Sequence, residues 1–172
     1  MISFDILTAL QALYYILPAY FANSVPTIFG GGSQIDLGRS FTDGRPWFGH
    51  HKTIRGFVSG LIAGVIIGFL QGTIVVGFLL SVGALFGDLV GAFAKRRLNI
   101  SSGYPFPVFD QLGFVAGALI FSSLLLPLGW PKIFFVLFFT PIIHVTTNVF
   151  AYFLKIKDVP WWCCSPKTLT SS

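Results

Sequence analysis

Ionisable side chains are few in this chain, and one of them lies inside a long apolar stretch. Asp88 is about five residues, or roughly 8 Å along a helix, before the end of the apolar run Gly56–Phe93. A carboxylate at that depth in a membrane is costly, which makes it a candidate functional residue. Lys95 follows on nearly the same helix face. A plain Asp88–Lys95 salt bridge is one interpretation, and a divalent metal on Asp88 beside a phosphate-binding basic cluster is the other.

Further acidic and basic residues border the apolar stretches. Asp110 stands at the start of one of them, and the alternative to a functional role is that it only caps the helix N-terminus. Asp36 lies in a basic loop that ends with Lys52 and Arg55. Magnesium prefers carboxylate oxygens and shares its other positions with water and substrate phosphate. These residues together predict a magnesium-dependent polyphosphate site at the membrane surface.

The composition determines which elements must position these residues. Of the 172 residues, 54% are hydrophobic and only 10% are charged. A soluble domain needs more polar surface than this, whereas a bilayer accepts apolar surface around a helix bundle. The sequence therefore predicts an all-α integral membrane protein.

Crossing the hydrocarbon takes about 20 apolar residues, and five stretches qualify. We predict a single membrane domain over 1–172 with spans at about 6–29, 56–71, 73–93, 111–128 and 133–154. The second and third spans form a hairpin divided at Gln71-Gly72-Thr73. Glycines repeat every fourth residue along three spans, which predicts close helix packing. They are Gly56, Gly60, Gly64, Gly68 and Gly72, then Gly83, Gly87 and Gly91, then Gly113 and Gly117.

The distribution of Lys and Arg predicts the orientation. With the N-terminus outside, ten of the eleven cations lie in the inner loops 30–55 and 94–110 and in the tail 155–172, which leaves only Lys132 outside. The prediction is a multi-pass protein of the cell membrane with a cytoplasmic C-terminus and a cytoplasmic active site. The simpler interpretation is that the cations only set this topology and touch anionic lipid headgroups. Cations confined to the membrane surface do not favour a nucleic-acid partner.

Several motifs in order resemble the archaeal CDP-archaeol synthases. They are Asn23, Ile35–Gly38, Phe48–Gly56, Gly87–Arg97, Asp110–Gln111, Asn148–Tyr152 and Val159–Trp161. The resemblance covers nearly the whole chain and implies a magnesium-dependent reaction. In it, CTP and a phosphorylated diether glycerolipid, itself a membrane lipid, give a CDP-activated lipid and pyrophosphate.

The related bacterial CDP-diacylglycerol synthases differ after Lys95-Arg96. This chain has Pro105–Gln111 where the bacterial pattern has His-Gly-Gly and two more carboxylates. A two-metal site on the bacterial plan is therefore in doubt.

The resemblance and the chemistry together suggest a role for each residue. Asp88 binds magnesium, and Asp110 is a second ligand or orients a bound water. The residues expected to bind the triphosphate are Lys52, Arg55, Lys95 and Arg96. Further substrate contacts are expected from Asn23, Asp36, His51 and Asn148. His144 lies one turn before Asn148, and the alternative is that the two only hydrogen-bond between helices. Arg97 points about 100° away from Arg96 and is expected to tolerate exchange for Lys.

Two other function classes compete with this interpretation. A small transporter or channel also uses buried polar residues, but it carries them near mid-membrane and often shows internal repeats. A CDP-alcohol phosphotransferase needs an Asp-Gly-x-x-Ala-Arg run, and Asp43-Gly44-Arg45 does not continue in that way.

Overall fold

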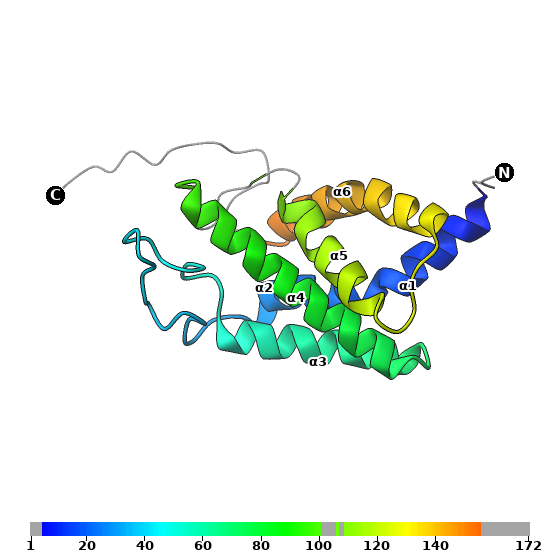
Figure 1. Ribbon diagram of the computed structural model, residues 1–172, viewed down its shortest axis with the longest axis horizontal. Coiled ribbons are helices and arrows are strands. Elements are labelled where there is room, and N and C mark those ends of the chain that lie inside the picture. Colours follow the sequence, from blue (N-terminus) through cyan, green and yellow to red (C-terminus); the bar gives the residue numbers. More distant parts are fainter. Residues whose placement is uncertain (1–4, 101–105, 107–108, 156–172) are drawn as a thin grey trace.

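The computed structural model describes residues 5–100, 106 and 109–155. Six helices form in this part of the chain: α1 (Ile6–Ser24), α2 (Pro26–Phe29), α3 (Ile54–Leu70), α4 (Ile74–Arg97), α5 (Phe109–Ser122) and α6 (Trp130–Phe153) (Figure 1). The described residues contain no strand and only two isolated β-bridges. The all-helical prediction is therefore confirmed for these residues. Two predicted segments lie partly outside the described residues. They are the tail 155–172, with the Val159–Trp161 motif, and the loop 94–110, of which 101–105 and 107–108 are not described.

The predicted hairpin is present. α3 ends at Leu70, and Gly72 has a φ of +72°, the left-handed conformation that reverses the chain before α4. The predicted fourth span differs in length, because α5 has only 14 residues and ends at Ser122. The Ser122 and Ser123 hydroxyls there donate to the carbonyls of Leu119 and Ile120. α5 is therefore about 21 Å long, less than the hydrocarbon thickness.

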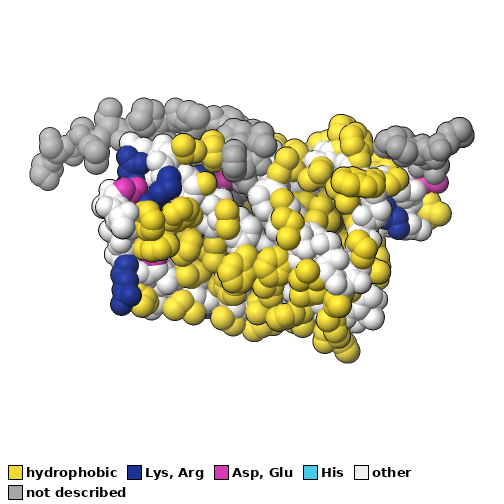
Figure 2. All heavy atoms as spheres, in the orientation of Figure 1, with side chains coloured by type: hydrophobic (Ala, Val, Ile, Leu, Met, Phe, Trp, Pro, Cys, Tyr) yellow, Lys and Arg dark blue, Asp and Glu magenta, His cyan; other side chains and the backbone are white. Residues whose placement is uncertain are grey.

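Two helices in the described part, α4 and α6, are long and apolar enough to cross a membrane, while α3 and α5 are apolar but shorter. In Figure 1 the loop between α2 and α3 lies at one end of the molecule, beside the C-terminal end of α4. In Figure 2 hydrophobic side chains cover the middle of the visible face, and Lys, Arg and Asp gather toward its ends. Large apolar side chains such as Ile62, Ile66 and Phe138 are exposed on the surface.

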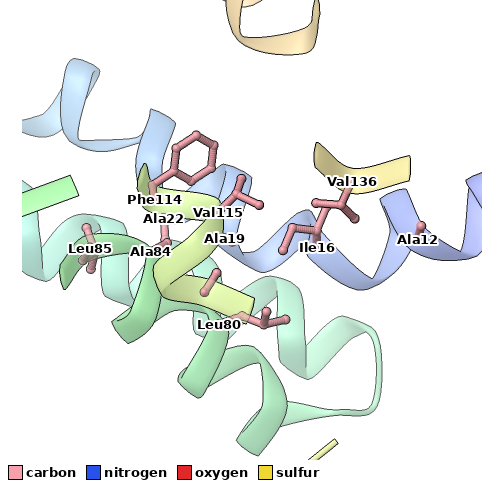
Figure 3. Packing of buried hydrophobic residues seen from close by; sticks show 11 residues of the cluster. Ala12, Ile16, Ala19, Ala22, Leu80, Ala84, Leu85, Phe114, Val115 and Val136 are labelled. Atoms are coloured by element: carbon pink, nitrogen blue, oxygen red, sulfur yellow. The ribbon is translucent and has the colours of Figure 1, made fainter. Parts of the chain in front are cut away.

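Small residues dominate the core between α1, α4, α5 and α6. Ala12, Ile16 and Ala19 of α1 are fully buried against Leu80 and Ala84 of α4, Val115 of α5 and Val136 of α6 (Figure 3). The α4–α5 contact is closest at the predicted glycines. A Cβ built on Gly87 would lie 2.3 Å from the Gly113 carbonyl oxygen, and one on Gly83 would lie 2.4 Å from that of Gly117. Only glycine permits this approach, and the glycine spacing predicted close helix packing without naming the helices.

A proline interrupts the hydrogen bonding of α1. Pro18 has no N–H, so the carbonyl of Tyr14, four residues earlier, lacks its partner within the helix. The Gln71 side chain in the α3–α4 turn donates to that carbonyl at 2.5 Å. The turn of the hairpin is thereby fastened to α1.

Candidate active site

The loop between α2 and α3 is closed at its base, and this fixes the position of Lys52. Ile35 N–H donates to the Lys52 carbonyl at 2.9 Å, and Ile54 N–H donates to the Ser33 carbonyl at 3.0 Å. Thr53 caps α3 by accepting from Gly56 N–H, and it also accepts from Gly31 N–H across the base. Hydrogen bonds therefore fix the backbone at Lys52 and on the residues that follow it.

Asp36 ties the two arms of this loop together. Its carboxylate accepts the backbone N–H groups of Gly38, Phe48 and Gly49 at 3.0 to 3.2 Å. Burial raises the pKa of Asp36, but the three N–H donors outweigh it, and the net pKa lies below the ordinary value. These contacts give Asp36 a loop-organising position, and its predicted substrate contact stays a prediction.

Lys52 reaches across to α4 and pairs with Asp88. The distance between Lys52 Nζ and Asp88 Oδ2 is 2.5 Å, and both side chains are about 30% exposed (28% and 32%). A salt bridge of Asp88 was one alternative at the sequence level, but its partner is Lys52 rather than Lys95. The pair is accessible enough for a ligand to reach both groups.

Lys95 pairs with Asp110 on α5. Its Nζ lies 3.0 and 2.9 Å from the two carboxylate oxygens, and Phe106 N–H donates to Oδ2 at 2.9 Å. The close α4–α5 contact at Gly87 and Gly113 lies two turns before Lys95 and one turn after Asp110, so helix packing sets this second pair. The two predicted metal ligands are thus each held by a different lysine.

Arg96 adds a buried positive charge to this cluster. It is 7% exposed, and within the described residues its Nε has no hydrogen-bond partner. Burial lowers the pKa of His51, and the neighbouring cations His50, Lys52, Arg96 and Lys95 lower it further. Since these charges act on one imidazole, the predicted residues His51, Lys52, Lys95 and Arg96 lie in one basic environment. Arg55, on the first turn of α3, is exposed.

Arg97 occupies a position that its sequence did not suggest. Its guanidinium pairs with Asp43 and donates from Nη2 to the carbonyls of Arg45, at 3.3 Å, and Pro46, at 2.6 Å. It also lies over the rings of Phe41 and Phe93 at 4.9 and 4.8 Å. These contacts give Arg97 partners that its place beside Arg96 did not suggest, and the expected tolerance of Arg97→Lys stays a prediction.

The remaining predicted residues gather beside a second feature, a cavity of about 260 Å³ between α1, α5 and α6. Asn23 and His144 line it together with Tyr20, Phe114 and Thr140. Asn148 is buried and its side-chain amide lies 3.1 Å from His144 Nδ1, with a further bond to the His144 carbonyl. Both partners of these bonds are on α6, and the alternative that His144 and Asn148 also bond between helices stays a prediction.

Phe114 connects the cavity to the ion pairs. It follows Asp110 by one turn on α5, so the two share a helix face. Its ring lies 6.0 Å from that of Tyr20 and 6.4 Å from that of His144. The structure therefore brings Asn23, His144 and Asn148 together on the side of α5 that leads to Asp110.

The donor set determines what metal the site can accept. Within the described residues no group of three His, Cys, Asp or Glu side chains could hold an ion alone. Magnesium commonly takes one or two carboxylates and completes its shell with water and substrate phosphate. Asp88 and Asp110 supply the two carboxylates that such an ion takes, so the donor set is compatible with the predicted magnesium site.

Sequence reasoning missed the pairing of Arg45 and Arg97. Arg45 Nη1 donates to the carbonyl of Arg97 at 2.7 Å, at the end of α4 where carbonyls lack helical partners. The run Asp43-Gly44-Arg45 did indicate a turn, because an Asp side chain commonly accepts the backbone N–H two residues later. Asp43 Oδ1 accepts that N–H at 3.1 Å.

Comparison with known proteins identifies the family of this chain. A family model described as CarS-like, CDP-archaeol synthase, matches residues 3–161. The CDP-archaeol synthase of Pyrococcus abyssi is 47% identical over 163 residues, which cover 88% of this chain and 97% of that protein. The synthases of Pyrococcus furiosus and Methanocaldococcus jannaschii are 48% and 44% identical, with similar coverage.

A solved structure described as an intramembrane enzyme for archaeal membrane lipids biosynthesis has the same fold. It superposes with a TM-score of 0.74 at 35% identity, covering 81% of this chain and 94% of that one. The transporter alternative is thereby set aside. The chain belongs to the CarS-like CDP-archaeol synthase family, whose members are CTP-dependent cytidylyltransferases of membrane-lipid biosynthesis.

Proposed function

We propose that the chain crosses the membrane five times, with the N-terminus outside and the C-terminus in the cytoplasm. In this arrangement α1 and α3 to α6 are the spans, and the site at the C-terminal end of α4 faces the cytoplasm. The excess of Lys and Arg in the segments 30–55 and 94–110 supports this orientation. The apolar band between charged ends in Figure 2 supports the membrane setting.

We propose further that the site transfers CMP from CTP to a phosphorylated archaeal diether glycerolipid. A lipid phosphate oxygen forms a bond to the α-phosphorus of CTP. The bond from that phosphorus to the oxygen bridging to the β-phosphate breaks, and pyrophosphate leaves. The attacking phosphate is already anionic near neutral pH, so no strong general base is required. The barrier is repulsion between anions, which positioning and positive charge reduce.

The observation that carries this proposal is the pair of Lys–Asp contacts beside the buried Arg96. Lys52 and Lys95 bind the triphosphate and, together with Arg96, offset charge as pyrophosphate leaves. Arg55 and His51 border this region and contact the outer phosphates. Asp88 and Asp110 would hold Mg²⁺, which when bound would neutralise charge on the phosphate oxygens. Without ligand, each lysine holds its carboxylate in place.

The cavity between α1, α5 and α6 suits the lipid substrate. Its lining is largely apolar, through Leu17, Phe21 and Ile143, and its polar groups include Asn23 and His144. A glycerol ether with isoprenoid chains has the same division between a polar end and apolar chains. Phe114 lies one helical turn from Asp110, so a lipid in this cavity would have its phosphate end near the ion pairs. Asn148 acts here by orienting His144.

Purified protein incubated with labelled CTP, Mg²⁺ and phosphorylated diether glycerolipid tests the proposal. The expected product is a lipid-soluble cytidine nucleotide, formed with one pyrophosphate per turnover. Asp88→Asn should abolish turnover, since volume is kept and charge is lost. Asp5→Asn is the matched control, because Asp5 only caps α1 and Asn caps equally well. Full activity of Asp88→Asn would refute the assignment of the site.

A further inference from the structure

Arg97 and the loop segment 41–47 form a two-way attachment, which we call the bracket. From α4, the Arg97 side chain reaches Asp43 and the carbonyls of Arg45 and Pro46. From the loop, the Arg45 side chain reaches back to the carbonyls of Arg97, at 2.7 Å, and Arg96, at 3.4 Å. Each arginine donates to the backbone that carries the other.

Aromatic rings enclose the bracket. The Arg97 guanidinium lies over Phe41 from the loop and Phe93 from α4. Trp47 packs on both rings, 4.7 Å from that of Phe41 and 5.7 Å from that of Phe93. A planar guanidinium can donate to two carbonyls and stack on rings at once, which a lysine ammonium cannot do.

The bracket is connected to Lys52 by a short path. Phe48 and Gly49 follow Trp47, and their N–H groups are held by Asp36. Ile35, next to Asp36, donates to the Lys52 carbonyl. Movement of the loop at Pro46 is therefore transmitted to the lysine that faces Asp88. The same contacts hold the last turn of α4, which carries Lys95 and Arg96.

We propose that Arg97 is a positioning residue of the transferase reaction. It touches no reacting group, and through the bracket it sets the distance between the loop that carries Lys52 and the helix that carries Asp88, Lys95 and Arg96. This inference rests on the proposed function of those four residues. A misplacement of about 1 Å at such a site can cost up to a hundredfold in rate.

The test combines kinetics with the fluorescence of Trp47. In a Trp130→Phe, Trp161→Phe, Trp162→Phe background, Trp47 is the remaining tryptophan. Arg97→Lys should raise the KM for CTP roughly tenfold and lower kcat. The charge stays, but the two hydrogen bonds of the guanidinium to backbone carbonyls and its stacking on the rings are lost. Acrylamide quenching of Trp47 should increase about twofold as its ring leaves Phe41 and Phe93. The thermal midpoint should stay close to wild type, since the helix core is untouched.

Arg39→Lys is the matched control, because Arg39 is exposed in the same loop and should change neither KM nor quenching. Phe41→Leu is a second variant, which removes one ring and should shift both readouts in the same direction. Unchanged KM and quenching in Arg97→Lys would overturn the inference. A lower thermal midpoint with unchanged KM would overturn it as well, since that result marks a purely structural contact.

Lys52→Met separates this inference from the proposed function. If Lys52→Met keeps wild-type kinetics, the proposed function of Lys52 fails. Trp47 quenching in Arg97→Lys still decides whether the bracket holds the loop.

Discussion

Exchange of Gly87 for Ala tests whether the α4–α5 contact sets the active-site geometry. The new Cβ would lie 2.3 Å from the Gly113 carbonyl oxygen and 3.0 Å from Phe114 Cα, both backbone atoms. Ordinary van der Waals contact begins near 3.4 Å, so the helices must separate by about 1 Å. That separation moves Lys95 on α4 away from Asp110 on α5.

Two measurements follow from that displacement. Overpacking of this kind costs about 1–3 kcal/mol in stability. A shift of about 1 Å between the charged residues should lower kcat by roughly 10- to 100-fold. Turnover of labelled CTP and thermal unfolding in detergent give the two values on the same sample.

Gly113 provides a control within the same contact. A Cβ on Gly113 would lie 3.5 Å from the Gly87 carbonyl oxygen, which is ordinary contact. Gly113→Ala should therefore keep kcat within about twofold, and it gains helix propensity of about 1 kcal/mol. Equal kinetics for Gly87→Ala and Gly113→Ala would refute the reasoning. Both glycines lie in the same contact, and only Gly113 has space for a Cβ.

Four further outcomes are expected. Lys52→Arg and Lys95→Arg should each lose most activity, because a guanidinium places its donors differently from an ammonium, and steady-state kinetics with varied CTP measures this. EDTA should stop the wild-type reaction and added Mg²⁺ should restore it, if Asp88 acts through the metal. A Cys at position 95 in sealed vesicles should react only with reagent on the cytoplasmic face, and labelling from outside would reverse the proposed topology. The folded pKa of Asp36 is depressed, so its contribution to loop stability is present above the unfolded pKa of about 3.9 and is lost as pH falls through the folded pKa. In the Trp130→Phe, Trp161→Phe, Trp162→Phe background, Trp47 quenching should therefore rise below pH 4 before the helices unfold.

Local patterns predicted a large part of the fold. The Gln71-Gly72-Thr73 break gave the α3–α4 turn, because a left-handed glycine is a local requirement. The end of α5 was not predicted, since Leu124–Leu126 continue the apolar run and hydropathy does not register the hydroxyl bonds of Ser122 and Ser123. The glycine spacing indicated a close contact but did not say which helices form it.

The sequence named candidate site residues but did not predict which of them form ion pairs. Asp88 and Asp110 were selected because carboxylates beside apolar stretches are costly. Their lysine partners depend on how the loop and α5 pack on α4, which sequence spacing does not determine. Lys95 shares a helix face with Asp88, yet it pairs with Asp110. The contacts of Arg97 were missed for the same reason, since the loop that it contacts is more than fifty residues away in sequence.

The bond from Gln71 to the Tyr14 carbonyl has a consequence for biogenesis. A chain made from its N-terminus delivers α1 to the bilayer with a gap in its backbone hydrogen bonding at Pro18. The donor that closes this gap is 57 positions later in the chain. In the proposed topology α1 is therefore incomplete as an independent membrane segment until the α3–α4 hairpin has been inserted beside it. The position of α1 along the bilayer normal is then fixed by a residue of a later turn as well as by its own sequence.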